Sequence, residues 1–407
     1  MISAASRPYI DASVPVLREH GLTITTLFYK NMLAEHPELT RVFNMGNQAR
    51  GAQQQSLASA VFAYAANIGT PEALGPVVKR IVHKHVSVGI RAEHYPIVGK
   101  HLLAAIKETL GDAATPPLID AWAEAYGSLA NLLIAAEAEL YSTAGVQPGE
   151  TRPMRVLEVK RESDSVLSIR FVPADDKPLP PFHAGQYVSV AVDLPDGRHQ
   201  LRQYSLSDAA GKDSLRISVK REDGQMSGQM TAPDAAPAGE VSNWIHANVK
   251  EGSVLQVTHP FGEFTPDTES DAPIVLLSAG VGITPMVSAL NRIAMVNPQR
   301  QVIFAYAARD ARHHPLQADV AAAQAAMPNL HVVTFYEDVG TDAPAGVLAG
   351  RMDIARLPAW DREQTDVWLC GPLKFMQAQW LALLDAGVPA ARLHREVFGP
   401  DMLDHLL

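Results

Sequence analysis

The chain has 407 residues, a formal net charge of −10, and an ordinary globular composition with 47% hydrophobic and 19% charged residues. A chain of this length exceeds what one hydrophobic core organises, so two or three domains are expected. The negative charge and the lack of any basic run argue against a nucleic-acid partner, which would need clustered Lys and Arg. The single cysteine, Cys370, excludes an internal disulfide and any multi-cysteine metal site.

The N-terminus and the apolar runs indicate the location of the chain. The N-terminal MISAASRPYIDAS has no apolar stretch of signal-peptide length, and the most apolar run, Ile274 to Leu277, is far shorter than a membrane span. Together with the lone cysteine, these features predict a cytoplasmic chain with no membrane span.

The first third of the chain is predicted to be all-helical. From Pro8 to about Tyr141, apolar residues recur three and four apart, as in VPVLREHGLTITTLFYKNMLAEH, which is the period of amphipathic helices. The stretch from Ser142 to Pro153, STAGVQPGETRP, concentrates Gly, Pro, Ser and Thr and is typical of a connector between domains.

The middle of the chain changes to the period of β-strands. Six short alternating runs follow, with turn residues between them, and they favour a small antiparallel barrel. These runs are MRVLEVKRE, SVLSIRFVP, QYVSVAVDL, LRQYSLSDA, SLRISVKRE and VLQVTHPFG.

The last third alternates apolar strands with helical stretches. After a polar segment from Thr265 to Pro273 come the strands IVLLSAG, QVIFAYAAR, HVVTFYED and DVWLCGP. Strands that alternate with helices favour a parallel sheet with helices on its faces.

A candidate iron ligand, His85, lies in the apolar-periodic helix VVKRIVHKHVSVGI. One nitrogen of a neutral imidazole can bind iron there while a second group accepts the N–H of the other nitrogen. The nearby His83, His94 and His101 compete for this role.

Four upstream residues resemble the distal side of a globin in their order and spacing: Tyr29, Phe43, Gln53 and Leu57. The resemblance implies that Phe43 packs on the haem and that Leu57 shapes the pocket. It implies that Tyr29 and Gln53 reach the ligand bound to iron, and that His85 is the proximal metal ligand. The alternative is that Tyr29, Phe43 and Leu57 are core residues of a helical bundle.

Tyr95 and Glu137 match positions that hydrogen-bond the proximal histidine and one another in bacterial flavohaemoglobins. A carboxylate behind an imidazole raises its electron donation, which favours activation of O2 over reversible storage. Lys84 matches a family lysine close to the flavin side of the haem. The alternative for Lys84 is a solvated helix charge.

A candidate flavin signature, RQYS, comprises Arg202, Gln203, Tyr204 and Ser205 and resembles that of ferredoxin-reductase-like proteins. Arg202 would offer its planar fork to the FAD phosphates, and Tyr204 and Ser205 would contact the isoalloxazine.

Two other segments support this flavin signature. Tyr187 in HAGQYVSV matches an aromatic ring stacked on FAD, and GEVSNW would bring Gly239 to Ser242 close to the pyrophosphate. The alternative is that Tyr187 and Tyr204 are cross-strand aromatics.

A candidate nicotinamide loop follows the strand IVLLSAG, where small residues let the backbone approach a pyrophosphate at a helix N-terminus. It comprises Gly280, Val281, Gly282, Ile283, Thr284 and Pro285. It departs from GxGxxG at Pro285, and no acidic ribose ligand follows near Arg300. It resembles instead the GxGxxP loop of ferredoxin-reductase-like domains, whose later Cys-Gly-Pro here begins at Cys370. That resemblance implies that Cys370 lies beside the nicotinamide, and the alternative is a small buried strand residue.

The C-terminal REVFGP completes the family pattern with Glu396, Val397, Phe398, Gly399 and Pro400. The resemblance implies that Phe398 covers the flavin ring until nicotinamide displaces it. It also implies that Glu396 lies between flavin and haem.

Together these motifs cover nearly the whole chain, which resembles the bacterial flavohaemoglobins. The resemblance implies a multidomain fold with an all-α globin domain (1–145), an antiparallel β-barrel FAD domain (151–264) and a ferredoxin-reductase-like α/β nicotinamide-binding domain (271–407). It implies haem b, FAD and NAD(P)H as cofactors. It also implies nitric oxide dioxygenase activity, in which electrons pass from NAD(P)H through FAD to haem iron, and bound O2 converts NO to nitrate.

Two other functions stay open. One is a redox or gas sensor that recruits a partner, and the other is a flavin reductase whose acceptor is a quinone, a ferric chelate or a lipid hydroperoxide. Tyr29 and Gln53 favour the iron chemistry, because they would have little purpose in a pure reductase. A monomer is expected, and the choice between NADH and NADPH and a lipid in the haem pocket stay open.

Overall fold

The computed structural model describes residues 2–43, 48, 51–70, 74–175, 177–224, 238–340 and 346–399. The chain divides into two compact units. Unit 1 comprises Met1–Glu150, Asp193–Arg202 and Gly399–Leu407, and unit 2 comprises Thr151–Val192 and Gln203–Phe398. The finer division at 1–145, 151–264 and 271–407 stays a prediction.

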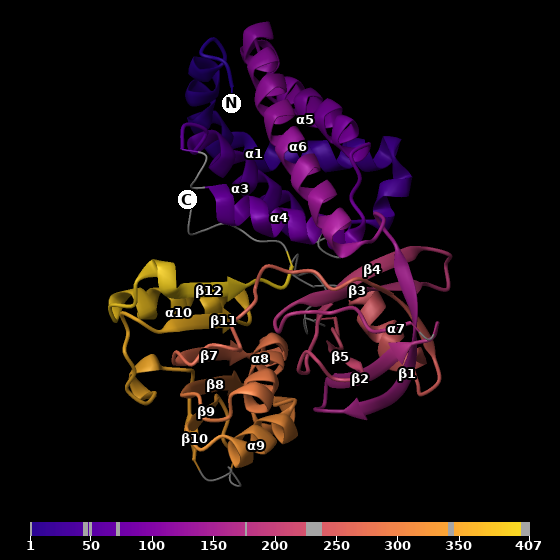
Figure 1. Cartoon of the computed structure of the whole chain (residues 1–407). Coiled ribbons are helices and arrows are strands. Elements are labelled where there is room, and N and C mark those ends of the chain that lie inside the picture. Colours follow the sequence, from indigo (N-terminus) through magenta and orange to yellow (C-terminus); the bar gives the residue numbers. More distant parts are fainter. Residues whose placement is uncertain are drawn as a thin grey trace. The chain divides into compact units, whose positions relative to one another are not determined.

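The N-terminal part of unit 1 is helical, as the apolar period predicts (Figure 1). Its elements are α1 (Arg7–Glu35), η1 (Pro37–Arg41), α3 (Ala52–Ala66), α4 (Gly75–Val88), α5 (His94–Leu110), η3 (Gly111–Ala113) and α6 (Pro116–Ala144). Its core joins α1, α3, α5 and α6 through side chains such as Phe28, Phe62, Ile106 and Trp122. No helix within the described residues combines the length and the apolar character needed to cross a membrane.

The connector after α6 is shorter than predicted. The helix continues to Ala144 and ends at Gly145, whose φ of +68° is the left-handed conformation that glycine adopts without steric cost. Strand β1 (Thr151–Arg161) follows, so only residues 145–150 connect the two elements. The predicted connector, Ser142 to Pro153, was therefore wrong at both ends, because its first residues extend the helix and its last lie in the strand.

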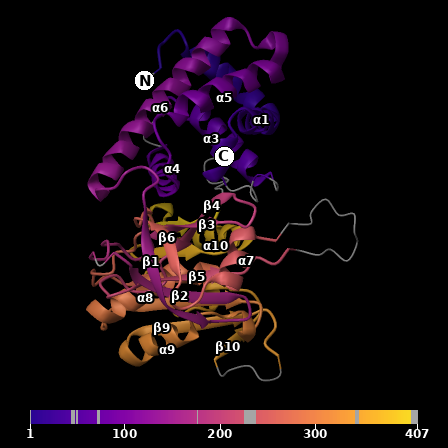
Figure 2. The same ribbon diagram turned by 90° about the vertical axis from the view of Figure 1, so that its right-hand side faces the viewer.

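The antiparallel sheet has the predicted six strands, in the order β4-β3-β6-β1-β2-β5. The other strands are β2 (Val166–Pro173), β3 (Tyr187–Asp193), β4 (His199–Ser205), β5 (Leu215–Lys220) and β6 (Val254–Thr258). An isolated antiparallel bridge between Leu206 and Ile217 links the two ends of this order, so the sheet closes as a barrel. Figure 2 shows β1, β2 and β5 side by side, with α7 (Glu240–Asn248) close to β5.

The second sheet is parallel throughout, in the order β10-β9-β8-β7-β11-β12. Its elements are β7 (Ile274–Ala279), α8 (Ile283–Val296), β8 (Val302–Ala308), α9 (Gln317–Ala326), β9 (Leu330–Tyr336), β10 (Val347–Ala349), β11 (Asp366–Cys370), α10 (Leu373–Asp385) and β12 (Leu393–Glu396). Successive residues of β7 pack in two cores. Leu276 joins the core under α8 and α9, whereas Leu277 joins the core under α10. Both faces are buried, which explains why the strand is apolar without alternation.

Two strands of this sheet were not predicted. Strands β10 and β12 have only three and four residues, too few to show a period. They extend the sheet at its two edges, whereas the four predicted strands form its centre.

Candidate functional site

His85 lies on α4 with its ring directed at a buried carboxylate. Its Nδ1 is 2.7 Å from Oε1 of Glu137 on α6 and 3.2 Å from the hydroxyl of Tyr95 on α5. The Tyr95 hydroxyl donates to the same Glu137 oxygen at 2.6 Å. The Glu137 side chain is 4% exposed and the His85 side chain 35%. Because Nδ1 faces Glu137, Nε2 is the nitrogen left for a metal ion.

Tyr95 is held as a hydrogen-bond donor. Burial raises the pKa of its hydroxyl far above the usual 10.0, and the bond to the Glu137 carboxylate raises that pKa further. A protonated phenol donates, and Oε1 of Glu137 is the oxygen that accepts from Tyr95. Three residues predicted from separate segments therefore form one hydrogen-bonded group.

Two tyrosines of α6 were not predicted and hold the backbone around this group. The Tyr126 hydroxyl donates to the carbonyl oxygen of Tyr95 at 2.6 Å, and the Tyr141 hydroxyl donates to that of Ile90 at 2.9 Å. The sequence contained a signal for both. Tyr126, Glu137 and Tyr141 recur at eleven and four residues, which places them on one face of the helix.

The four predicted distal residues belong to the same unit. Tyr29 is 5% exposed, and its hydroxyl is hydrogen-bonded to the side chain of Gln53. Its ring meets Phe43 edge-on, with 5.6 Å between centroids, and Phe43 and Leu57 are partly buried against the core. Burial raises the pKa of Tyr29 well above 10.0, and the bond to Gln53 offsets only part of that increase. The hydroxyl therefore keeps its proton.

The competing histidines lie in other surroundings. His101 is 3% exposed, and its Nε2 lies 3.5 Å from the carboxylate of Glu35. The Nδ1 of His94 accepts a bond from the backbone N–H of Arg91 at 3.2 Å. His83 lies half-buried on α4. Neither His94 nor His101 has the buried carboxylate that His85 has.

The RQYS residues lie on β4. Nη1 of Arg202 donates to the carbonyl oxygen of Leu201 at 2.7 Å, Gln203 is exposed, and Tyr204 is half-buried. Ser205 is buried, and its Oγ makes no hydrogen bond to any residue that the structure describes. Buried hydroxyls normally have partners, so Ser205 is suited to a bound polar group.

Tyr187 is the first residue of β3, and Ser242 lies in the first turn of α7. Tyr187 is 4% exposed and packs against Gly262, where φ is +131° and an added Cβ would lie 3.1 Å from the tyrosine ring. The Ser242 hydroxyl donates to the carbonyl oxygen of Gly239 at 3.1 Å and accepts from the backbone N–H of Glu222 at 3.2 Å. The Ser242 hydroxyl is therefore engaged with the backbone beside the helix.

The GVGITP residues, Gly280 to Pro285, form η4 (Gly280–Gly282) and the start of α8. Gly280 has φ of +54°, a conformation that favours glycine. A Cβ on Gly282 would collide with the carbonyl of Cys370 and lie 2.6 Å from the amide nitrogen of Gly371. The loop and the Cys-Gly segment therefore lie so close together at the N-terminus of α8 that residue 282 has no room for a side chain.

Parallel register places three polar side chains in one row at the carboxyl edge of this sheet. Cys370 on β11 lies opposite Ser278 on β7 and Glu396 on β12. Cys370 is fully buried, and Glu396 accepts a bond from the backbone N–H of Val397 at 2.8 Å. Ser278 was not predicted, although it is the one hydroxyl in the apolar strand IVLLSA. Its buried Oγ makes no hydrogen bond within the described part of the chain.

The last predicted residues differ in exposure. Phe398 is 45% exposed. Gly399 has φ of +104°, and its carbonyl oxygen accepts a bond from Nζ of Lys84 at 2.9 Å. Pro400 lies outside the described residues.

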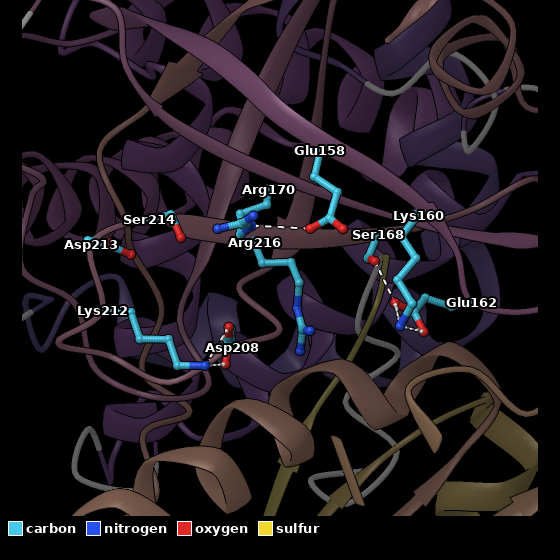
Figure 3. Close-up of a pocket in the computed structure, with 10 residues that line it drawn as sticks. All are labelled: Glu158, Lys160, Glu162, Ser168, Arg170, Asp208, Lys212, Asp213, Ser214 and Arg216. Carbon is cyan, nitrogen blue, oxygen red and sulfur yellow. Dashed lines mark hydrogen bonds and ion pairs between the residues drawn. The ribbon is translucent and has the colours of Figure 1, made fainter. Parts of the chain in front are cut away.

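A pocket of about 440 Å³ opens elsewhere in the barrel and is lined by residues on and next to β1, β2 and β5 (Figure 3). Its walls alternate in charge, and each of its four cations has an acidic partner: Lys160 with Glu162, Arg170 with Glu158, Lys212 with Asp208, and Arg216 with Asp319. Paired cations leave little positive potential for an anion, and the predicted motifs lie elsewhere in the chain.

Two family models match the chain: Globin over residues 26–133 and Oxidoreductase NAD-binding domain over residues 276–380. Flavohemoproteins of Bordetella parapertussis and Rhizobium meliloti are 48% and 44% identical to it. These alignments cover 98% and 99% of this chain and 99% of each relative.

Two solved structures are similar to this chain, one over nearly its whole length and the other over its reductase part. The crystal structure of flavohemoglobin from Malassezia yamatoensis with bound FAD and heme has a TM-score of 0.84 and 29% identity, over 98% of this chain and 100% of that one. The flavohem-like FAD/NAD-binding domain of nitric oxide dioxygenase from Vibrio cholerae has a TM-score of 0.55 and 36% identity, over 62% of this chain and 100% of that one. The chain therefore belongs to the flavohemoprotein family, as an oxidoreductase that joins a globin domain to an FAD/NAD reductase.

Proposed function

We propose that this chain is an NAD(P)H-dependent nitric oxide dioxygenase, which converts NO and O2 to nitrate and so removes nitric oxide. The observation that carries the proposal is the buried carboxylate of Glu137 at 2.7 Å from Nδ1 of His85, with Tyr95 bonded to the same oxygen. A ligand backed by a carboxylate donates more electron density to iron, which favours oxygen activation over oxygen storage.

The residues of the globin domain fit a haem. His85 offers Nε2 as the iron ligand, because its Nδ1 is engaged by Glu137. Phe43 and Leu57 offer partly buried apolar surface for the porphyrin. Lys84, next to the iron ligand, is half-buried and offers a cation beside the haem.

When bound, haem supplies an iron centre for O2, and FAD supplies a carrier that accepts a hydride and releases single electrons. Glu137 accepts a hydrogen bond from the Nδ1–H of His85 and so fixes the tautomer and the orientation of the ring. Tyr29 keeps its phenolic proton because its pKa is raised by burial, and Gln53 holds that hydroxyl in place. These two side chains orient the oxygen substrate by hydrogen bonds.

The barrel residues fit FAD. The guanidinium of Arg202 offers a fork of donors to the phosphates, next to Gln203 at the exposed surface. Tyr204 and Tyr187 offer flat faces to the isoalloxazine. Ser205 offers the buried Oγ that lacks a partner within the described residues. Ser242, in the first turn of α7, belongs to the segment that approaches the pyrophosphate.

The carboxyl edge of the parallel sheet fits the nicotinamide nucleotide. Gly280 to Thr284 bring backbone N–H groups to the N-terminus of α8, where phosphate binds well, and Pro285 follows in the first turn of the helix. Cys370 and Glu396 lie next to one another at the carboxyl edge of the parallel sheet. Phe398 offers the exposed aromatic ring that covers the flavin until nicotinamide binds. Val397 orients Glu396 through its backbone N–H.

The comparisons support this proposal. The Malassezia yamatoensis relative contains FAD and heme, and the Vibrio cholerae relative of the reductase part is named as a nitric oxide dioxygenase. We extend both properties to this chain, together with a cytoplasmic location and a monomeric state.

The test uses purified holoprotein with both cofactors, identified by a Soret band and flavin absorbance. Protein and NADH are mixed without air, NO and O2 are added, and nitrate and NADH are followed. We expect nitrate to form as NADH is consumed, and His85→Ala to abolish nitrate formation while NADH-dependent reduction of ferricyanide continues. Full NO consumption by His85→Ala would refute the assignment of the iron ligand.

The same assay separates the proposed function from a flavin reductase. NADPH replaces NADH, and a quinone, a ferric chelate or a lipid hydroperoxide replaces NO, in parallel reactions. Turnover with any of these acceptors that exceeds turnover with NO would contradict the proposal.

A further inference from the structure

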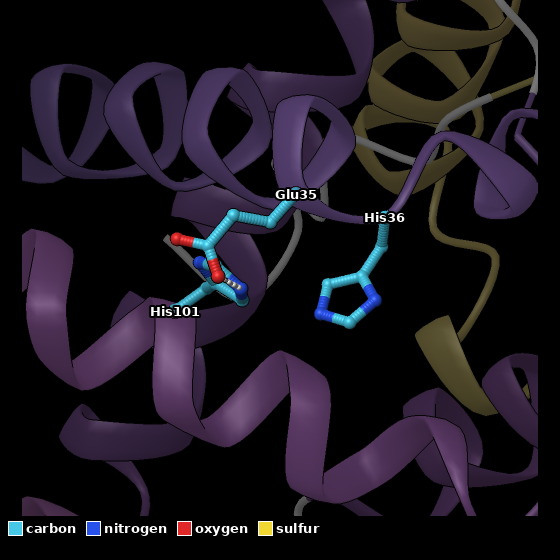
Figure 4. A group of neighbouring side chains, drawn as sticks. All are labelled: Glu35, His36 and His101. Carbon is cyan, nitrogen blue, oxygen red and sulfur yellow. Dashed lines mark ion pairs between the residues drawn. The ribbon is translucent and has the colours of Figure 1, made fainter.

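A cluster of metal-ligating side chains lies where α1 ends (Figure 4). Glu35 is the last residue of α1, His36 follows it, and His101 lies on α5. One ligand atom from each of the three lies within 4.8 Å of the others. Two imidazoles and one carboxylate are a common donor set for Zn²⁺.

The position of His101 is the main observation in favour of a metal site. It is 3% exposed, and its buried Nε2 makes no hydrogen bond to a described residue. That nitrogen lies 3.5 Å from Oε2 of Glu35. Two ligands of a tetrahedral zinc ion, each about 2.0–2.1 Å from the metal, lie about 3.3 Å apart. This pair therefore already has almost the spacing that a shared ion requires.

The ring of His36 is prepared for the same ion. Its Nδ1 is 3.0 Å from Oε1 of Glu38, which leaves Nε2 as the ligand nitrogen. A carboxylate bound to the far nitrogen of a metal-ligating histidine is the usual second contact of such sites. The rings of His36 and His101 are nearly perpendicular, with 5.6 Å between centroids, and Figure 4 shows one ring nitrogen of His36 directed toward the other two residues.

One cation already contacts the cluster. Nζ of Lys100 lies 2.9 Å from Oε2 of Glu35, with side chains 66% and 56% exposed. An ion pair this exposed contributes little free energy, so a divalent ion can displace it. Lys100 also shows that the carboxylate attracts a positive charge.

We propose that Glu35, His36 and His101 bind a divalent transition-metal ion, with Zn²⁺ as the best match to this donor set. Water completes the coordination, because the Glu35 side of the site is exposed. The ion joins the end of α1 to α5. Tyr29 lies six residues earlier on α1, so the bound ion restricts the helix that carries a distal residue. The proposal does not depend on the NO chemistry.

The test uses full-length holoprotein without a polyhistidine tag, treated with chelator and then titrated with Zn²⁺ by calorimetry. We expect one saturable site that is lost or weakened at least about tenfold in His36→Gln and Glu35→Gln. Glu38→Gln is expected to bind roughly 10- to 100-fold more weakly, through the loss of its contact with His36. Zn²⁺ should raise the midpoint of thermal unfolding of the wild type and not that of His36→Gln.

The matched control is His20→Gln, which removes a partly exposed histidine of α1 next to Glu19 and should bind Zn²⁺ as the wild type does. Absorption at the zinc K-edge, which haem iron does not disturb, should report two imidazoles and oxygen ligands. We substitute His36 and not the buried His101, because the loss of the His36 side chain leaves the core intact. Equal affinity and stoichiometry in wild type and His36→Gln, or no saturable binding, would overturn the proposal.

Discussion

The proximal side of the globin domain and the carboxyl edge of the parallel sheet hold their functional residues in position by different interactions. Around His85, side chains from three helices share one carboxylate, Glu137. At the sheet edge, the backbone of Gly282 contacts that of Cys370, and strand register sets the row of side chains.

This difference predicts different sensitivities. A hydrogen-bonded group tolerates small changes in shape but responds to the loss of a proton or a charge. Backbone packed against backbone responds to added volume, because close-packed interiors have no room for it. Chemical substitutions should therefore disturb the globin domain most, and steric substitutions the sheet edge.

Among the substitutions that compare the two regions, Gly282→Ala should have the largest effect. The new Cβ would collide with the carbonyl of Cys370, and the loop would have to move away from the Cys-Gly segment. A displacement of about 1 Å in a substrate-positioning group lowers rates by roughly 100-fold, so NADH-dependent reduction of ferricyanide should fall by about that factor. The control is Gly127→Ala on α6, where an added Cβ would have no described atom within 4 Å apart from its chain neighbours and the backbone of its own helix. Equal ferricyanide rates in both variants would show that the loop has room to adjust.

The next largest effect is expected for the loss of a charge in the globin domain. Glu137→Gln keeps the shape but removes the charge behind His85, and we expect NO consumption to fall roughly 10- to 100-fold. The iron–histidine stretching frequency should fall as well, whereas ferricyanide reduction should not change. Tyr95→Phe removes one donor and keeps the carboxylate, so its effect should be smaller. An unchanged stretching frequency in Glu137→Gln would contradict the role of the carboxylate.

A single lost hydroxyl on the distal side should have a smaller effect. Tyr29→Phe removes the buried phenolic proton and should speed O2 dissociation about tenfold, the value of one hydrogen bond to a charged group. Stopped-flow absorbance measures the dissociation rate. Tyr64→Phe, which removes a hydroxyl bonded to the carbonyl of Ala125, is the matched control and should leave that rate unchanged. Identical rates in both variants would place the Tyr29 hydroxyl away from the oxygen site.

The stability of the parallel-sheet region should also depend on pH. Burial lowers the pKa of His314 from 6.5 to about 4, so between these pH values the unfolded chain binds more protons than the folded chain. The free energy of unfolding should therefore fall as the pH falls from 6.5 to 4, by about 1.4 kcal/mol per pH unit from this group.

His314→Gln should remove that part of the slope in urea denaturation measured across the window. His331→Gln is the control, because His331 is exposed on β9. A clear loss of the pH slope in His314→Gln would sharpen the comparison of the two regions. It would show that the parallel-sheet region, which we expect to respond mainly to added side-chain volume, also contains a buried titratable group. The same slope in wild type and His314→Gln would contradict the pKa shift.

Sequence reasoning succeeded where a local period or a motif carries the signal. The helical period, the six alternating runs and the four central parallel strands all appear in the structure. Strands β10 and β12 were missed because three or four residues show no period. The connector after α6 was misjudged because its Ser and Thr residues continue the helix up to Gly145.

The hydrogen bonds of His85, Tyr95 and Glu137 to one another were expected from the resemblance, and the structure contains them. Glu137 and Tyr95 were identified by resemblance, but the sharing of one oxygen with His85 is a property of three packed helices. Tyr126 and Ser278 were missed, since a helix-face tyrosine and a strand serine are common residues whose partners depend on the fold.

By itself, the sequence determined the order of an all-α domain, an antiparallel barrel and a parallel sheet, because hydrophobic period depends only on neighbouring residues. The sequence also marked the motifs. Only the tertiary structure decided that Gly282 must lack a side chain, that Cys370 lies between Ser278 and Glu396, and that two histidines meet Glu35. These facts join residues far apart in the chain, and no local pattern encodes the distance between them.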